Sequence, residues 1–339
     1  MRLRRMALAD GSGTTTAVLD EARGTWIGLA PALEAADASL REALAAARDD
    51  VVAFLAGGDG VHEATTELLA RVEEPAALDP APLLPFQPRS FRDFSIWEEH
   101  MTAAARAMAR RFLPPAVGKI SGGFERATSR TFPPFKPKAG FYEHPIFYVG
   151  NHLAFYPDGA AVPWPRASEW FDFELELGFV VARPVHDADA AASEAVIGGF
   201  FVLNDWSARD VQAHDYRTHP LTQVAKAKAT ANSIAAEVVT RDEVLPRWQS
   251  LTGSVRVNGE QWCSGTTAGP QHGLGEMVAY ASQDEFLVAG EVLATGTLPG
   301  CCGLEVDRWP RRGDEVELAI EGVGTLRNRL DGDNPPPCD

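Results

Sequence analysis

The stretch Asp172-Phe-Glu-Leu-Glu-Leu-Gly178 alternates acidic and apolar side chains and leads directly into Phe179-Val-Val181. Successive side chains of a β-strand point to opposite faces, so the apolar residues share one face and the acidic residues the other. On such a strand Glu174 and Glu176 lie about 7 Å apart. Buried acids repel each other unless they are protonated or share a cation, and a hard cation with oxygen ligands, such as Mg²⁺, Mn²⁺ or Ca²⁺, would relieve the repulsion. The competing interpretation is an antiparallel strand whose acidic face lies in water.

The composition is that of an ordinary globular protein. The chain has 339 residues, of which 45% are hydrophobic and 23% charged, enough for a large core with a small domain beside it. A formal net charge of −16 argues against nucleic acids and anionic membranes as partners. No run approaches the ~18 apolar residues of a membrane span, and the start lacks a signal-peptide core. The 4 cysteines have neither zinc-ligand spacing nor a disulfide framework, so we expect a cytoplasmic location.

Turn residues and prolines predict three regions. Residues 1–85 are expected to form a small α+β domain, with strands at 1–8, 14–20 and 25–29 and helices at 33–55 and 61–72. Residues 86–330 carry many short strands, helices near 95–112 and 273–282, and a glycine- and proline-rich loop or lid at 118–145. Residues 331–339 are expected to be a disordered tail. The pattern as a whole predicts a mixed α/β fold that is mainly β.

Two polar segments carry candidate site residues. Asp205 follows the apolar run Phe200-Phe-Val-Leu203, a frequent position for a site residue and equally for a helix cap. On a helix, Arg209 and Gln212 would share a face with Asp205 and could grip a substrate carboxylate.

Asp93 and His100 are separated by two helical turns, so one helix would bring them to the same side. His100 could act as a general base near neutral pH, although a lone histidine is more often structural.

Three motifs then occur in order: Glu174-Leu-Glu176, Asn204-Asp-Trp-Ser-Ala-Arg-Asp210 and Leu293-Ala-Thr-Gly-Thr-Leu-Pro-Gly300. From about Arg89 to Leu330 the chain resembles the fumarylacetoacetate hydrolase family. The resemblance implies a fumarylacetoacetase-type β-roll core at residues 86–330, a homodimer and one divalent cation. Mg²⁺ is the expected ion, with Mn²⁺ or Ca²⁺ as alternatives. The implied metal ligands are Asp93, Glu174, Glu176 and Asp205.

The resemblance also implies catalytic and binding roles. His100 matches the base, Glu305 the acid that orients it, and Lys228 the lysine that stabilises an oxyanion, with Lys226 as an alternative. Substrate-binding positions match Arg209, Gln212, Tyr148 and Thr297. After these lysines, residues 229–237 lack the aromatic residue and the Gly-Pro turn usual in the family, so the substrate and the choice of lysine stay open.

The implied activity is metal-dependent hydrolysis of a carbon–carbon bond in a β-diketone or acylpyruvate-type acid, by a water that His100 activates. The partner would be a small-molecule keto acid. The alternative is a decarboxylase or tautomerase of a 2-oxo dicarboxylic acid, because the same metal and enolate stabilisation serve both. A non-catalytic binding protein is disfavoured, since binding alone requires no base.

Overall fold

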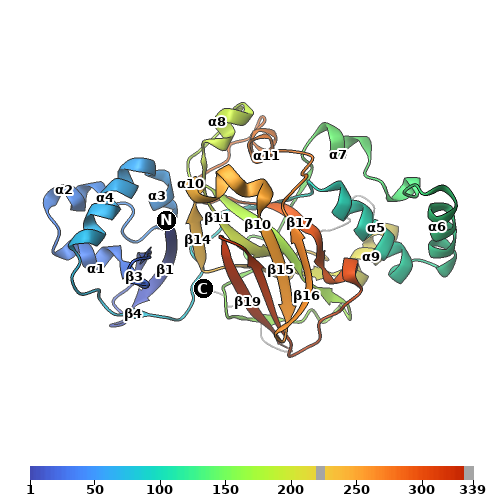
Figure 1. The fold of residues 1–339 in the computed structure, drawn as a ribbon, viewed down its shortest axis with the longest axis horizontal. Coiled ribbons are helices and arrows are strands. Elements are labelled where there is room, and N and C mark those ends of the chain that lie inside the picture. The colour runs from blue at the N-terminus through green and yellow to red at the C-terminus, as the bar shows by residue number, and fades with distance from the viewer. Residues whose placement is uncertain (219–225, 332–339) are drawn as a thin grey trace.

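The computed structural model describes residues 1–218 and 226–331 (Figure 1). A 12-stranded sheet forms the centre, with the main strand order β3-β2-β1-β14-β11-β10-β17-β5-β6. Its strands are β1 (Arg2–Leu8), β2 (Thr14–Asp20), β3 (Thr25–Gly28), β4 (Leu78–Asp79), β5 (Phe91–Phe94), β6 (Phe147–Val149), β7 (Phe155–Tyr156), β10 (Glu174–Val181), β11 (Ile197–Asn204), β13 (Asn232–Ile234), β14 (Glu237–Thr240) and β17 (Val292–Cys302).

A 5-stranded sheet with the order β16-β15-β18-β19-β8 packs against the large sheet, and β9 and β12 form a short pair. These strands are β8 (Ala161–Pro163), β9 (Phe171–Asp172), β12 (Ser207–Ala208), β15 (Thr252–Val257), β16 (Glu260–Thr266), β18 (Glu315–Ile320) and β19 (Gly324–Asp331). The helices are α1 (Leu29–Glu34), α2 (Ala38–Ala43), α3 (Val51–Ala56), α4 (Gly58–Arg71), α5 (Glu98–Phe112), α6 (Pro115–Thr128), α7 (Ala139–Glu143), α8 (Ala190–Glu194), α9 (Arg209–Thr218), α10 (Arg241–Val244), α11 (Leu274–Ala281) and α12 (Gly303–Val306), with the 3₁₀ helices η1 (Pro133–Phe135) and η2 (Leu245–Ser250). The expectation of a mixed α/β fold is confirmed.

Strand β10 separates two hydrophobic cores. Leu175 and Leu177 pack between the large and the five-stranded sheet, whereas Val180 packs on the opposite face with residues of the N-terminal region. The predicted alternation is therefore confirmed. The interpretation with the acidic face in water is wrong, because Glu174 and Glu176 are only 3% and 1% exposed.

The N-terminal region continues the large sheet. Strand β1 pairs antiparallel with β14, and Leu3 and Phe54 share a core with Phe201 and Val238. The three expected strands are present. The single helix expected at 33–55 is wrong: the side chains of Asp37 and Asp50 accept backbone N–H groups and start new helices there. A domain boundary at residue 85 stays a prediction.

Helices α1–α4 gather at one end of the molecule in Figure 1, and α5–α7 gather at the opposite end. The loop expected at 118–145 is wrong, since α6, η1 and α7 occupy much of that segment, whereas its role as a lid stays a prediction. Proline favours the first turn of a helix, where its missing N–H costs nothing, and both α6 and η1 begin this way.

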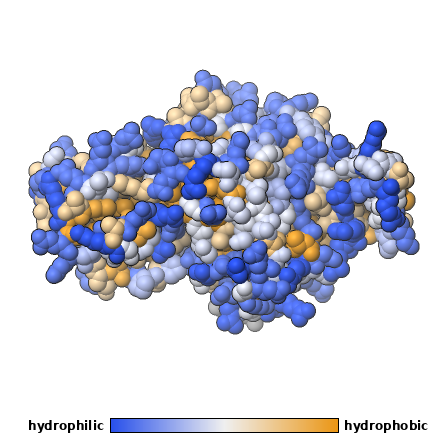
Figure 2. Space-filling model, in the orientation of Figure 1, coloured by the Kyte–Doolittle hydropathy of each residue, from blue (hydrophilic) through white to orange (hydrophobic). Residues whose placement is uncertain are grey.

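The surface and the chain end add two observations. The face drawn in Figure 2 is mostly hydrophilic, with the largest hydrophobic area over the N-terminal helices. Among the described residues, no helix is long and apolar enough to cross a membrane. Strand β19 includes Asp331, and the rest of the expected tail, 332–339, lies outside the described residues.

Candidate active site

Neighbouring strands of the large sheet each supply one of the predicted site residues. Glu176 of β10 lies opposite Thr297 of β17, and Asp93 of β5 lies opposite Tyr148 of β6. Asp205 directly follows β11, the other neighbour of β10. The order β11-β10-β17-β5-β6 therefore brings together five positions that are far apart in the sequence.

Asp93, Glu176 and Asp205 form a buried carboxylate cluster, hereafter the acid cluster. Each offers an oxygen, and these oxygens lie within 4.8 Å of one another. Burial, reinforced by neighbouring carboxylates, raises the pKa of Asp93 and Glu176 well above its usual range. Within the described chain, Asp93 Oδ1 and Glu176 Oε2 have no hydrogen-bond partner. Oxygen ligands around Mg²⁺ or Ca²⁺ lie at most about 4–5 Å apart, so the acid cluster fits a divalent cation.

Glu174, the fourth predicted ligand, lies outside this group of three. Its carboxylate accepts hydrogen bonds from Arg209 Nη2 and Lys228 Nζ. Burial alone would raise the pKa of Glu174, but these two cations outweigh it and hold that pKa below its usual range. Lys228 Nζ also donates to Asp205 Oδ2, so one ammonium group links Glu174 to the acid cluster. The role of Glu174 as a metal ligand stays a prediction.

The two candidate lysines differ in their surroundings. Lys228 is buried among the site carboxylates, whereas Lys226 is exposed. Burial would lower the pKa of Lys228, yet the charges of Asp205 and Glu174 raise it above its usual value. The ammonium group of Lys228 is therefore the one that lies in the site.

Arg209 and Gln212 lie together near the start of α9 and are buried. Arg209 Nη1 donates to Gln212 Oε1 at 3.0 Å, and Arg209 Nε donates to Asp172 at 2.8 Å. Asp205 precedes the helix, so the single helical face expected for all three residues is wrong. The pair β12–β9 intervenes and places Arg209 beside Asp172 and Glu174. A substrate-binding role for Arg209 and Gln212 stays a prediction.

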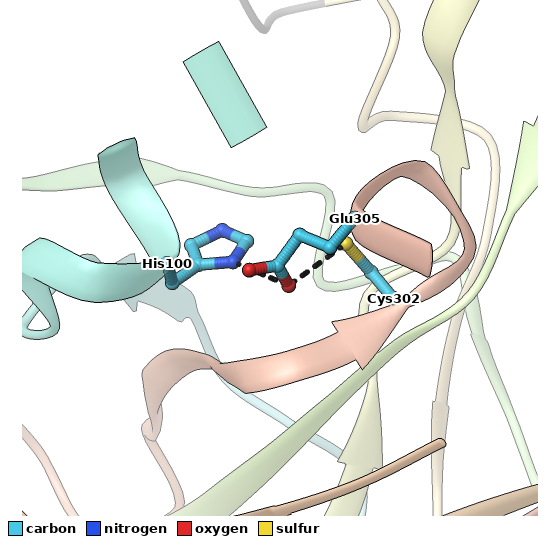
Figure 3. A group of neighbouring side chains, drawn as sticks. All are labelled: His100, Cys302 and Glu305. Carbon is cyan, nitrogen blue, oxygen red and sulfur yellow. Dashed lines mark hydrogen bonds and ion pairs between the residues drawn. The ribbon is translucent and has the colours of Figure 1, made fainter. Parts of the chain in front are cut away.

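His100, Cys302 and Glu305 form a second group of neighbouring side chains (Figure 3). His100 Nδ1 lies 3.1 Å from Glu305 Oε2, and Cys302 Sγ donates to the same oxygen at 3.3 Å. Since a carboxylate only accepts, it holds the proton on Nδ1 and leaves Nε2 as the basic nitrogen. Asp93 lies in β5 and His100 in the first turn of α5, so the expectation of one shared helix is wrong.

Sequence reasoning missed two residues that support this pair. Asp172 accepts hydrogen bonds from the backbone N–H groups of Gly303 and Leu304, at 2.8 and 3.0 Å. It thereby anchors the start of α12, which carries Glu305, to the strand that precedes Glu174. Its position on the acidic face of the alternating stretch was the available signal. The sequence held no such signal for Cys302, because its contact with Glu305 depends on how the chain passes from β17 directly into α12.

A cavity of about 440 Å³ joins these groups. Asp205 is absent from its lining, but the other predicted residues of the acid cluster contribute to it. The predicted site residues on its wall are Asp93, His100, Tyr148, Glu174, Glu176, Arg209, Gln212, Lys228 and Thr297. Tyr148 Oη donates to Asp205 Oδ2 at 2.8 Å, and Thr297 Oγ1 lies 3.5 Å from Glu176 Oε1. An imidazole, an ammonium group and buried carboxylates therefore face one enclosed space.

Residues 128–331, more than half of the chain, match the family described as Fumarylacetoacetate (FAA) hydrolase C-terminal. The chain therefore belongs to the fumarylacetoacetate hydrolase family, and the resemblance noted in the sequence is confirmed. Enzymes of this family bind a divalent metal ion, which agrees with the acid cluster.

Individual relatives differ in their named activities. A bifunctional isomerase/decarboxylase of 4-hydroxyphenylacetate degradation from Escherichia coli is 31% identical over 196 residues, 58% of this chain and 42% of that protein. An uncharacterized protein of Pyrococcus abyssi is 28% identical over 188 residues, 56% of this chain and 80% of that protein. The solved structure of a fumarylacetoacetate hydrolase from Exiguobacterium antarcticum shares the fold, with a TM-score of 0.64 and 19% identity over 98% of this chain and all of that one. The protein is thus an enzyme of this family, either hydrolase or isomerase/decarboxylase.

Proposed function

We propose that the protein is a metal-dependent hydrolase that cleaves a carbon–carbon bond in a β-diketone or acylpyruvate-type acid. The observation that carries this proposal is the contact between His100 Nδ1 and Glu305 Oε2 in a cavity that also reaches the acid cluster. A metal site alone would serve binding or decarboxylation. The attack of water on a carbonyl also requires a base in this position.

The acids Asp93, Glu176 and Asp205 would hold the divalent ion, with Glu174 as a further ligand. When bound, the ion supplies Lewis-acid polarisation of the oxygens of a diketo group. His100 Nε2 takes a proton from water, and the resulting hydroxide bonds to the acyl carbonyl carbon. The carbon–carbon bond then breaks, its electron pair passes to the pyruvate fragment as an enolate, and the proton that His100 took from water returns to this carbon to complete pyruvate. The products are a carboxylic acid and pyruvate.

The remaining residues of the site have distinct tasks in this reaction. Lys228 is placed to offset charge on the tetrahedral oxyanion, a contribution of about 3 kcal/mol for a well-aligned donor. Glu305 keeps the imidazole of His100 in the tautomer that can accept the proton from water. Arg209, Gln212, Tyr148 and Thr297 would orient the substrate.

The second candidate is a decarboxylase or tautomerase of a 2-oxo dicarboxylic acid. It is favoured by the 31% identity to the isomerase/decarboxylase of Escherichia coli. Decarboxylation uses the same enolate stabilisation without a water-activating base, so His100 discriminates hydrolysis from decarboxylation. Tautomerisation moves a proton and can use His100 as its base, so the products distinguish it from hydrolysis.

The test is a panel of acylpyruvates and 2-oxo dicarboxylic acids, read by loss of enol absorbance with Mg²⁺ and after chelation. We expect hydrolysis of acylpyruvates that chelation abolishes, and a loss of roughly 10²–10⁴-fold in kcat for His100→Ala. The variant His144→Ala, on a histidine outside the cavity, is the control. Decarboxylation or tautomerisation of 2-oxo dicarboxylic acids by the unaltered protein, without any cleavage of acylpyruvates, would establish the second candidate instead.

The homodimer and the cytoplasmic location expected from the sequence remain predictions. Light scattering of the purified protein tests the first, and a monomeric mass at micromolar concentration would contradict it.

A further inference from the structure

We propose that the cavity selects 2-oxo acids whose acyl group is neutral and apolar, and that it rejects those ending in a second carboxylate. This inference rests on the proposed function for the assignment of the reactive end of the substrate. It goes further because it names what the rest of the cavity accepts.

The first observation is an apolar stripe along α5 that begins at the catalytic histidine. Met101, Ala104, Ala105 and Met108 follow His100 at helical spacing and line the same cavity. With a rise of 1.5 Å per residue, the stripe carries the cavity about 12 Å along α5, away from His100. An acyl group whose carbonyl lies beside His100 would extend along this stripe.

A second part of the cavity wall is also apolar, and its residues are tied to one another. It is formed by Val117 of α6 together with Phe132 and Phe135 around η1. The rings of Phe132 and Phe135 pack edge to face, with centroids 5.2 Å apart. Glu125 of α6 accepts a hydrogen bond from the backbone of Phe132 at 3.1 Å, so the wall is tied to α6.

Several charged groups around the cavity are already paired. Arg106 of α5 makes an ion pair with Glu125, with Nη2 2.9 Å from Oε1, and neither residue lines the cavity. At the reactive end, Arg209 is paired with Asp172 and Glu174, and Lys228 is bound by Glu174 and Asp205.

A second carboxylate at the far end would therefore meet no lysine or arginine among the described residues of the cavity wall. Among the described residues that line the cavity, Arg209 and Lys228 are the only lysine or arginine side chains. Residues 219–225, which the structure does not describe, contain neither lysine nor arginine. A carboxylate moved into such apolar surroundings loses its hydration without compensation, whereas a methyl or phenyl end gains from burial. A cavity of about 440 Å³ also leaves room for an acyl group larger than acetyl.

The test uses ligands that the proposed hydrolase cannot cleave. 2-Oxooctanoate and 2-oxosuberate are matched in chain length, end in a methyl group and a carboxylate respectively, and lack a β-diketone. Calorimetry on the Mg²⁺-loaded protein should show that 2-oxooctanoate binds at least roughly 100-fold more tightly. Each methylene added from 2-oxobutanoate to 2-oxooctanoate should improve affinity roughly fourfold. Equal binding, tighter binding of 2-oxosuberate, or no binding of either ligand would overturn the proposal.

A variant pair tests the location of the selectivity. Met108→Arg places a cation at the far end of the stripe and should improve 2-oxosuberate binding roughly tenfold, through a charge-assisted hydrogen bond. Met108→Gln, similar in length and neutral, should not. Unchanged 2-oxosuberate affinity in a folded Met108→Arg protein, judged by its melting temperature, would count against the proposal. If that variant does not fold, the wild-type comparison decides alone.

The two proposals fail differently. Selective binding of 2-oxooctanoate without hydrolysis of any acylpyruvate would refute the proposed function and leave this inference standing. Hydrolysis that is faster for acylpyruvates ending in a carboxylate would refute this inference and leave the proposed function standing.

Discussion

The substitution Glu305→Gln removes the charge behind His100 and changes little else. Glu305 Oε2 lies 3.1 Å from His100 Nδ1, and the Glu305 side chain is only 4% exposed, so water screens this contact weakly. Glutamine has the same shape but no charge. Its amide can also donate to Nδ1, which would leave Nε2 protonated and unable to accept a proton from water.

The expected loss in kcat follows from the contact between Glu305 and His100 that the substitution weakens. When His100 takes the proton of water it becomes a cation, and its hydrogen bond to Glu305 becomes charge-assisted on both sides. Such bonds contribute about 1.5–3 kcal/mol, so kcat should fall about 10- to 150-fold. KM should change little, because Glu305 does not line the cavity. Metal affinity should also be retained, because Glu305 is not part of the acid cluster.

The assay is steady-state cleavage of an acylpyruvate, with Mg²⁺ affinity measured separately by calorimetry. Glu99→Gln, an exposed substitution next to His100 on α5, is the matched control and should leave kcat unchanged. A kcat for Glu305→Gln within twofold of wild type, in a protein with an unchanged melting temperature, would refute the positioning role. If Glu305→Gln weakened Mg²⁺ binding as much as it lowered kcat, the substitution would be acting on the fold of the site instead.

Three further predictions concern the acid cluster and the backbone around it. Glu176→Gln should weaken Mg²⁺ or Mn²⁺ binding at least ~10-fold in calorimetry, because it removes a charged ligand; unaltered affinity would disprove the metal assignment. Asp172→Asn removes one of the two buried carboxylates that pair with Arg209. It should lower the free energy of unfolding by about 3–5 kcal/mol in urea denaturation. A loss below about 1 kcal/mol would contradict the role of Asp172 as a buried partner of Arg209. Gly296→Ala puts a Cβ 2.3 Å from the carbonyl oxygen of Phe94 at a φ of +85°, and should destabilise the protein by more than about 1 kcal/mol. Gly122→Ala, where a Cβ meets nothing within 4 Å, is its control, and equal melting temperatures for the two variants would refute the steric argument.

Local patterns in the chain predicted the parts of the fold that depend on neighbours in sequence. The alternation through Glu174 and Glu176 predicted a strand with one apolar and one acidic face, because strand side chains alternate whatever surrounds them. The strand at Thr14–Asp20 and the helix α11 followed from turn residues and spacing in the same way. The errors arose at 33–55 and 118–145. There, aspartate caps divided an alanine-rich run, and prolines that resemble loop residues began helices instead.

The sequence by itself determined which chemical groups the protein has and which of them share a strand face, since both depend only on residue type and backbone period. Only the tertiary structure decided which groups meet. Asp93, Glu176 and Asp205 converge because β5, β10 and β11 lie close together in one sheet, and that order is set by long-range pairing. The same folding placed Lys228 rather than Lys226 among the acids, and set the apolar stripe of α5 beyond His100. Burial then shifted the pKa values of Asp93 and Glu176 upward, because desolvation depends on everything packed around them rather than on their neighbours in the chain.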